Sequence, residues 1–339
     1  MHSSGLIDLQ VNGYAGVDFN HANLDAVALE HALAAMLHAG VTTCLPTIIT
    51  ATEDELAARL HALDEAAAKS ELAAAMVPGF HLEGPFLNPG KGYAGCHPSA
   101  AMQPPDPAVL ERLTARLTRP VLLLTMAPER EGAAATIAWA RAHGMLVAIG
   151  HSAAEEDAVA RAAAAGAVLS THLGNGLPQM QPKFRNPLMA QLSEDRLFAS
   201  FIADGIHIPT HALKVLVRAK GLERSVLVTD ATAGASASPG LYGFAGMAIE
   251  RAADGSVRVP GQGVLAGSAL CLDEAVRNLV AWDIADAAAA VGLAANNPAA
   301  LLAPALAFHG LSRPATMLIW SDDLRPTRVR LDRREIRVR

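Results

Sequence analysis

Aromatic side chains and basic charge are both scarce in this chain of 339 residues. Phe, Trp and Tyr make up 4% of the sequence, and 27 Lys and Arg stand against 33 Asp and Glu, for a formal net charge of −6. Binding of nucleic acid relies on a basic surface, and binding of single strands relies on aromatic stacking as well. We therefore expect no nucleic-acid partner, and a small molecule is the default ligand.

Cysteine is scarce, and neither a leader segment nor a membrane span is expected. The three cysteines, Cys44, Cys96 and Cys271, are scattered and form no CxxC motif, which fits reduced thiols in a cytoplasmic protein. The segment 1–5 has no basic stretch followed by an apolar core, so no secretory signal is expected. The uncharged stretch 287–308 is interrupted by two Asn and two Pro, so we predict buried helices there and no membrane span.

What the sequence does contain is enough apolar residues for a large core. Hydrophobic residues make up 51% of the chain and charged residues 18%. A chain of this size buries roughly three quarters of its surface on folding, so it needs no metal for stability alone. A metal, if bound, would serve chemistry.

Eight short apolar runs alternate with Ala- and Leu-rich segments of helical spacing. They are Leu6–Val11, Val41–Ile48, Val77–Leu82, Val121–Met126, Leu146–Ile149, Val168–Thr171, Phe198–Ala203 and Val226–Thr229. Continuous runs of this kind are typical of parallel strands buried on both faces. We predict a (β/α)8 TIM barrel over residues 5–305. An open doubly wound sheet is the alternative, but the glycines of 261–267 lack the spacing of a dinucleotide-binding loop. Alternating apolar residues and Arg in 306–339 predict short antiparallel strands.

Acidic and imidazole side chains follow several of these runs, where the active site of such a barrel lies. Glu83 comes directly after the third run, and a carboxylate there needs a cation because its desolvation is costly. His151 and His172 follow two neighbouring runs. Two imidazoles and one carboxylate form a catalytic zinc site with one open position. The alternatives are an ion pair of Glu83 with Arg, and histidines that are hydrogen-bonded core residues.

Three further strand ends carry candidate functional side chains. Asp230 could accept a proton from a metal-activated water and return it to a leaving amine, the alternative being a helix N-cap. His207 is predicted to contact substrate. Gln10 and Asn12 stand where hydrolases with two metals carry His-x-His, and amides are poor zinc ligands, so a single metal is predicted.

Eight short motifs, in order, carry a family resemblance that spans Gly5 to about Arg277. They are Leu6–Gly13, Leu45–Thr50, His81–Phe86, Gly150–Ser152, Thr171–Leu173 with Asn175, Ala203–His207, Thr229–Thr232 and Leu265–Leu270. On these motifs the chain resembles the N-acetylglucosamine-6-phosphate deacetylases of the amidohydrolase superfamily.

The resemblance implies a TIM barrel with a small β-sandwich and one divalent metal, Zn²⁺ by preference, held by Glu83, His151 and His172. It implies that Asp230 is the general acid and base, and that acetate is removed from an amino-sugar phosphate by a homodimer. It also implies substrate contacts. These are His97 at the acetamido carbonyl, His207, and Asn175 and Gly176 at the sugar.

The chain departs from the family pattern in three places. The segment Gly90–Pro98 keeps His97 but has one Lys fewer, and Leu177–Pro187 replaces the segment with the phosphate-binding Arg, which leaves Lys183 or Arg185 as candidates. The first strands of the sandwich have no counterpart, so 306–339 with residues 1–4 would form a truncated remnant. Two alternatives stay open: an amidohydrolase for a different N-acyl substrate, and a metal-binding barrel without catalysis.

Overall fold

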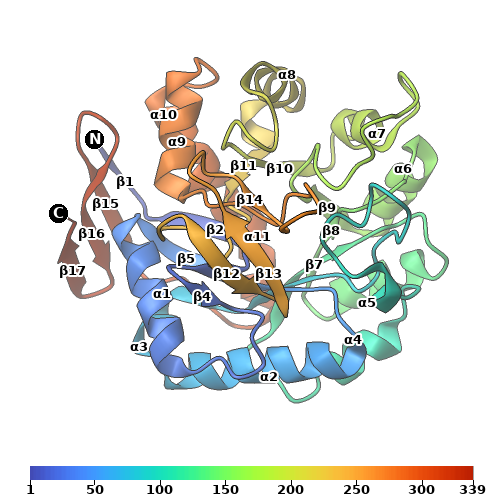
Figure 1. Ribbon diagram of the computed structural model, residues 1–339, viewed down its shortest axis with the longest axis horizontal. Helices are drawn as coiled ribbons and strands as arrows, with labels where there is room; N and C mark the ends of the chain where they lie inside the picture. Colours follow the sequence, from blue (N-terminus) through green and yellow to red (C-terminus); the bar gives the residue numbers. More distant parts are fainter. Residues whose placement is uncertain (339) are drawn as a thin grey trace.

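Eight parallel strands form the centre of the protein in the computed structural model, which describes residues 1–338 (Figure 1). The strands pair in the order β11-β10-β9-β8-β7-β6-β5-β2. They are β2 (Leu6–Val11), β5 (Val41–Ile49), β6 (Phe80–Glu83), β7 (Val121–Met126), β8 (Leu146–Ile149), β9 (Ala167–Ser170), β10 (Phe198–Ile202) and β11 (Ser225–Val228). Almost all of their residues are buried, as the continuous apolar runs predict.

The sheet closes into a barrel between β2 and β11. The backbone N–H of Asp230 donates to the carbonyl of Gln10 over 2.9 Å, and the N–H of Asn12 donates to Ala231 over 2.7 Å. The buried Asp8 carboxylate strengthens this seam, since it accepts from the N–H of Thr229 at 3.2 Å and from its hydroxyl at 2.5 Å. The predicted (β/α)8 barrel is confirmed.

Strand β6 differs from its predicted bounds. It begins at Phe80, three residues later than expected, because Pro78 and Gly79 form a bend before it. Glu83 is the last residue of the strand and lies at the mouth of the barrel.

Helices surround the barrel, and several begin at the side-chain caps that their sequences provide. Thr52 and Glu55 form a reciprocal capping box, and Asp25, Asn186 and Asp286 each accept a backbone N–H. The helices are α1 (Ala26–His38), α2 (Glu53–Lys69), α3 (Glu71–Met76), α4 (Pro107–Thr114), α5 (Ala133–Ala142), α6 (Glu156–Ala165), α7 (Pro187–Ser193), α8 (Thr210–Lys220), α9 (Leu272–Ala281), α10 (Ala287–Ala294) and α11 (Asn296–Phe308), with short 3-10 turns at Ser99–Ala101 and Leu222–Arg224.

The uncharged stretch 287–308 forms the last two of these helices. By length and composition it would suffice to cross a membrane, but half of it is buried within the protein. It breaks at Ala295 into α10 and α11, which pack on α9 and on strands β2 and β11. The prediction of buried helices describes this segment well.

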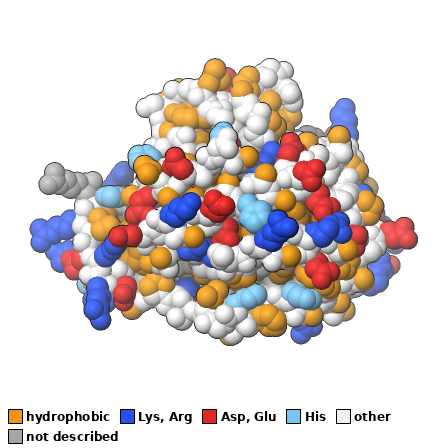
Figure 2. All heavy atoms as spheres, turned by 90° about the horizontal axis from the view of Figure 1, so that it is seen from below, with side chains coloured by type: hydrophobic (Ala, Val, Ile, Leu, Met, Phe, Trp, Pro, Cys, Tyr) orange, Lys and Arg blue, Asp and Glu red, His pale blue; other side chains and the backbone are white. Residues whose placement is uncertain are grey.

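Helix α2 lies along the lower edge of Figure 1, and Figure 2 views the molecule from that side. Lys, Arg, Asp and Glu side chains are interspersed across this face (Figure 2). Arg112 of α4 forms an ion pair with Glu53 of α2, with Nε 2.6 Å from Oε1.

The chain termini meet in one four-stranded antiparallel sheet, at the left of Figure 1. It contains β1 (His2–Ser3), β15 (Thr316–Trp320), β16 (Pro326–Leu331) and β17 (Arg334–Arg337). The apolar alternation in the tail thus forms the predicted strands. Leu318, Trp320, Val329 and Leu331 are buried on one face.

A second small sheet lies beside the barrel mouth and was not anticipated. A separate short hairpin is formed by β3 (Gly13–Tyr14) and β4 (Val17–Asp18). The small sheet contains β12 (Gly240–Phe244), β13 (Met247–Arg251) and β14 (Val257–Arg258). Its buried residues Phe244, Ile249 and Val257 pack on Ile49 and Ala266. The glycines and exposed side chains of β12 hide its strand pattern in the sequence.

Candidate active site

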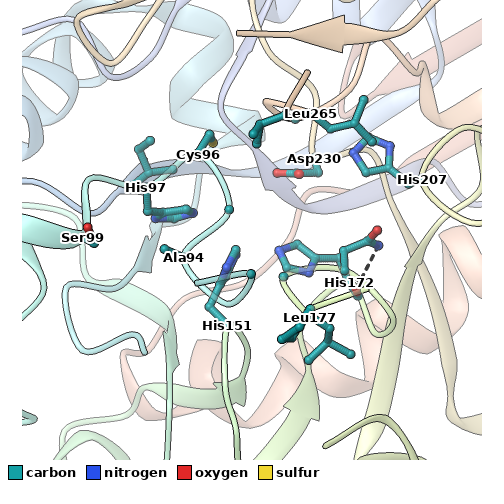
Figure 3. A pocket seen from close by; sticks show the side chains of 18 of the residues that line it. Ala94, Cys96, His97, Ser99, His151, His172, Leu177, His207, Asp230 and Leu265 are labelled. Carbon is teal, nitrogen blue, oxygen red and sulfur yellow. Dashed lines mark hydrogen bonds between the residues drawn. The ribbon is translucent and has the colours of Figure 1, made fainter. Parts of the chain in front are cut away.

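Glu83 lies at the centre of a group of buried imidazoles. Its Oε1 is 3.0 Å from Nε2 of His172 and 3.4 Å from Nε2 of His151, and its Oε2 is 3.8 Å from Nε2 of His97. These histidines come from three separate segments of the chain, yet their side chains and that of Asp230 surround one cavity (Figure 3). The structure therefore brings together the four residues of the predicted metal and proton-transfer site, with His97 beside them.

Backbone strain coincides with this group. His151, His172 and Asp230 have φ values of 49°, 30° and 50°, in the left-handed region that residues other than glycine rarely adopt. Each lies within two residues of the end of a barrel strand. Such a conformation costs about 1–3 kcal/mol and persists only where the surrounding structure imposes it. Strain at three site residues indicates that function, and not local stability, selects their geometry.

The donor set fits a metal ion. Nδ1 of His151 is 2.6 Å from the carbonyl oxygen of Tyr93, which can only accept, so Nδ1 carries the hydrogen. In the neutral ring the lone pair of Nε2 then faces the Glu83 carboxylate, and this buried nitrogen has no hydrogen-bond partner. Two acceptors that face each other need a cation between them. A carbonyl that orients a histidine in this way is typical of metal sites.

Four buried side chains lie where they could provide metal ligands. Ligand atoms of Glu83, His97 and His151 all lie within 4.8 Å of one another, and His172 approaches Glu83 more closely than either of the other two histidines. His97 is thus a further nitrogen within reach, and the set of Glu83, His151 and His172 stays a prediction.

The pKa values of the two carboxyl groups in the site are shifted in opposite directions. Burial by itself would raise the pKa of Glu83, but the hydrogen bond from His172 and the electrostatic effect of the surrounding imidazoles outweigh it and hold that pKa well below its usual range. Burial, reinforced by the negative charge of Glu83, raises the pKa of Asp230 to about 6. Burial and the neighbouring His151 lower the pKa of His97 to about 3. One carboxylate is thus suited to hold a cation and the other to exchange a proton near neutral pH.

Asp230 is held by two amides. Its Oδ1 accepts from Nε2 of Gln10 at 3.1 Å and from Nδ2 of Asn12 at 2.7 Å, and Nε2 of Gln10 also donates to Glu83 at 3.1 Å. The sequence pattern predicts only that these two amides are poor zinc ligands. It does not predict their contacts with Asp230.

The predicted sugar contacts also line the cavity, whose volume is about 1040 Å³. His207 is oriented by Asp204, with Nδ1 2.6 Å from Oδ2. Asn175 and Gly176 form part of the rim. At Gly176, with φ of 61°, a Cβ would lie 2.6 Å from Nδ1 of His151, so only glycine fits.

The two candidates for phosphate binding lie elsewhere. Lys183 and Arg185 are exposed and do not line the cavity of the described chain. The lysine and arginine side chains on its lining are Lys91 and Arg258. Neither Lys183 nor Arg185 reaches the cavity of its own subunit, and their contact with a phosphate stays a prediction.

Sequence reasoning missed several supporting side chains. The Thr50 hydroxyl lies 3.0 Å from Nδ1 of His97 and donates to the carbonyl of Glu83 over 3.2 Å. His81, buried below the site, lies between the hydroxyls of Thr47 and Thr125 at 3.2 and 2.8 Å. Glu129 accepts from Asn88, Ser152 and the N–H of Ala153, and so ties together the loops after three strands. The sequence places these residues in or near the ends of barrel strands but does not predict which partners they contact.

The chain has relatives among known sequences and among solved structures. No protein-family model matches the sequence. An N-acetylglucosamine-6-phosphate deacetylase of Caenorhabditis elegans is 32% identical over 317 residues, covering 88% of this chain and 73% of the relative. An N-acetylgalactosamine-6-phosphate deacetylase of Escherichia coli O157:H7 is 32% identical over 299 residues, covering 87% and 76%.

Solved structures agree with the sequence relatives. The N-acetyl-D-glucosamine-6-phosphate deacetylase of Mycobacterium smegmatis superposes with a TM-score of 0.87 at 29% identity, covering 99% of this chain and 87% of that one. A variant of the same enzyme, in complex with N-acetyl-D-glucosamine-6-phosphate, gives a TM-score of 0.84, covering 97% and 85%. The resemblance seen in the motifs is confirmed: the chain belongs to the N-acetylglucosamine-6-phosphate deacetylase family.

Proposed function

We propose that this protein is a metal-dependent amidohydrolase that removes the acetyl group from N-acetylglucosamine-6-phosphate, giving glucosamine-6-phosphate and acetate. The observation that carries the proposal is the convergence of Glu83, His151 and His172 beside Asp230 in one cavity. Family membership supports the same reaction, since the relatives named above are amino-sugar-phosphate deacetylases.

Glu83, His151 and His172 would hold the metal, and zinc suits this set of two nitrogens and one oxygen. A bound divalent ion supplies a Lewis acid for the amide carbonyl and makes water acidic enough to ionise near neutral pH. The chain's own contribution is to fix these ligands. The Tyr93 carbonyl orients the ring of His151, and the backbone N–H of His172 donates to the Ser200 hydroxyl over 2.8 Å.

Asp230 would move the proton. Since burial and the charge of Glu83 raise its pKa to about 6, Asp230 accepts a proton from the attacking water and releases it again without a large penalty. As the carbon–nitrogen bond breaks, the same carboxyl protonates the departing amine. Asp230 ends the cycle ionised, as it began.

Three other residues would bind and orient the substrate. His97 would lie beside the acetamido carbonyl, with its ring orientation fixed by the Thr50 hydroxyl, which is 3.0 Å from Nδ1. His207, in the loop after β10, would contact the sugar and is held in place by Asp204. Asn175 would offer its side chain at the rim, next to the compact Gly176.

A homodimer would complete the phosphate site. Met180 and Phe184 are 88% and 78% exposed on the segment that carries Lys183 and Arg185, and apolar side chains of this size suit a subunit interface. Lys183 or Arg185 would then reach the sugar phosphate in the other subunit's cavity. Within the same subunit, Lys91 and Arg258 are the available cations.

Acetate release from a panel of substrates tests the proposal. N-acetylglucosamine-6-phosphate should be hydrolysed with the highest kcat/KM by zinc-loaded protein, ahead of N-acetylgalactosamine-6-phosphate, unphosphorylated N-acetylglucosamine and N-acetyl amino acids. Activity should disappear after chelation and return with metal. A preference for an unphosphorylated substrate would favour the alternative of another N-acyl compound, and equally poor rates on all would favour a barrel without catalysis.

A further inference from the structure

The two oxygens of the Asp230 carboxylate have unequal surroundings. Oδ1 accepts hydrogen bonds from Gln10 and Asn12, at 3.1 and 2.7 Å, whereas Oδ2 accepts none from the side chains and backbone of residues 1–338. Hydrogen bonds from N–H groups stabilise the charged form of a carboxylate, so an oxygen that already accepts two of them is the poorer proton acceptor. The free oxygen is therefore the one suited to proton exchange.

We propose that Gln10 and Asn12 are positioning residues that reserve Oδ2 of Asp230 for the proton and hold this carboxylate at a set distance from Glu83. The proposal rests on the deacetylase reaction proposed above. In that reaction an O–H bond of water breaks as Oδ2 receives the proton. The Oδ2–H bond then breaks as an N–H bond forms on the leaving amine, so the proton count balances.

Gln10 has a second contact that Asn12 lacks. Its Nε2 carries two hydrogens and lies 3.1 Å from both Oδ1 of Asp230 and Oε1 of Glu83. The three side chains are buried, with exposed fractions of 2% for Gln10, 2% for Glu83 and 9% for Asp230. Two buried carboxylates repel each other, and a shared donor offsets that repulsion without adding a second cation.

The backbone keeps this arrangement rigid. The carbonyl of Gln10 accepts from the N–H of Asp230 at 2.9 Å, so main chain and side chain join the same two residues across the β2–β11 seam. The N–H of Asn12 donates to Ala231, the residue after Asp230. Both amides are therefore held in register with the carboxylate that they orient.

This difference in contacts gives the two amides separable signatures. Asn12 touches only Asp230 of the two carboxylates, so Asn12→Leu should lower kcat by about a hundredfold with KM nearly unchanged, and leave metal affinity unchanged. Gln10 touches Glu83 as well, so Gln10→Met should lower kcat and also weaken metal binding by about tenfold. Metal affinity is measured by competition with a chromophoric chelator and needs no substrate.

Gln191→Met is the matched control. Gln191 is equally buried, but its Nε2 donates to the carbonyl of Pro187 within α7, away from the site. It should change neither kcat nor metal affinity. If Asn12→Leu or Gln10→Met is poorly folded, Asn12→Ala and Gln10→Ala replace them, with the same expectations.

Two results would overturn the proposal: kcat within about twofold of the parent in both folded variants, or equal losses of metal affinity in the Asn12 and Gln10 variants. If the parent protein releases no acetate from any substrate, the proposed function fails. The difference in metal affinity between the two variants still decides whether Gln10 alone supports Glu83.

Discussion

Nε2 of His172 lies 3.0 Å from Oε1 of Glu83, although 89 positions separate the two residues in the chain. Both are almost fully buried, at 3% and 2% exposure. Burying a carboxylate against neutral imidazoles would be costly without a cation, so this contact indicates that the site holds a metal ion.

Replacing Glu83 tests this directly. Glu83→Gln keeps the shape of the side chain but removes the negative charge, so bound metal should fall from about one per chain to below about a tenth after dialysis. Elemental analysis of the purified protein measures it. Glu155→Gln, at an exposed position before α6, is the control and should retain full metal content. Full metal content in Glu83→Gln would remove Glu83 from the ligand set.

Asp230→Asn separates proton transfer from metal binding. Asparagine cannot accept and return a proton, so kcat should fall by roughly a thousandfold, within the range that general acid–base groups contribute. Metal content should stay near one per chain, because Asp230 is not in the predicted ligand set. Steady-state acetate release and elemental analysis give the two readouts. Turnover at the parent rate would show that another group carries the proton.

Thr50 provides a test of how His97 is oriented. Thr50→Val removes the hydroxyl that lies 3.0 Å from Nδ1 of His97, and kcat should fall by about tenfold. Thr50→Ser keeps the hydroxyl and should stay close to the parent. Equal activities of the valine and serine variants would mean that this hydrogen bond does not matter for catalysis.

Asp8 should make stability depend on pH. Burial, only partly offset by hydrogen bonds from Thr229, raises the pKa of Asp8 to about 7 from an ordinary value of 3.8. The folded state then holds a proton that the unfolded state has lost. The contribution of Asp8 is therefore fully present below about pH 4 and is lost as the pH rises through about 7, by an amount on the order of 4 kcal/mol.

Urea unfolding at several pH values tests this prediction. Asp8→Asn resembles the protonated acid at all pH values, so its free energy of unfolding should decline less than that of the parent between about pH 5 and 8. Parallel pH profiles for the two proteins would contradict the raised pKa.

Lys220 should stabilise the junction of α7 and α8. Lys220 is 7% exposed, and its ammonium group donates to the carbonyls of Gln191 at 3.1 Å and Glu194 at 2.8 Å. Lys220→Met leaves these acceptors unpaired and should cost about 1–3 kcal/mol. Lys214→Met removes only a contact with the 97% exposed Asp283 and should change stability by less than about 0.5 kcal/mol. Similar losses of free energy in both variants would contradict this assignment.

Local sequence patterns are enough to specify the barrel and the chemical nature of its site. Continuous apolar strands such as Val121–Met126 can be satisfied only when both faces are buried, so repetition of these runs with intervening helices specifies parallel strands. Polar residues that end such strands meet at one face of the barrel, which is why the sequence alone predicts that Glu83, His151, His172 and Asp230 lie together.

Contacts that depend on side-chain direction are visible only in the folded chain. That Lys183 and Arg185 lie outside the cavity, and that Gln10 lies between two carboxylates, follows from loop paths and strand register that the one-dimensional pattern does not encode. The sheet β12–β14 likewise gains its stability from packing on Ile49 and Ala266, distant in sequence, and not from its own weak alternation. Local patterns specify which residues are buried, whereas long-range packing specifies which atoms face each other.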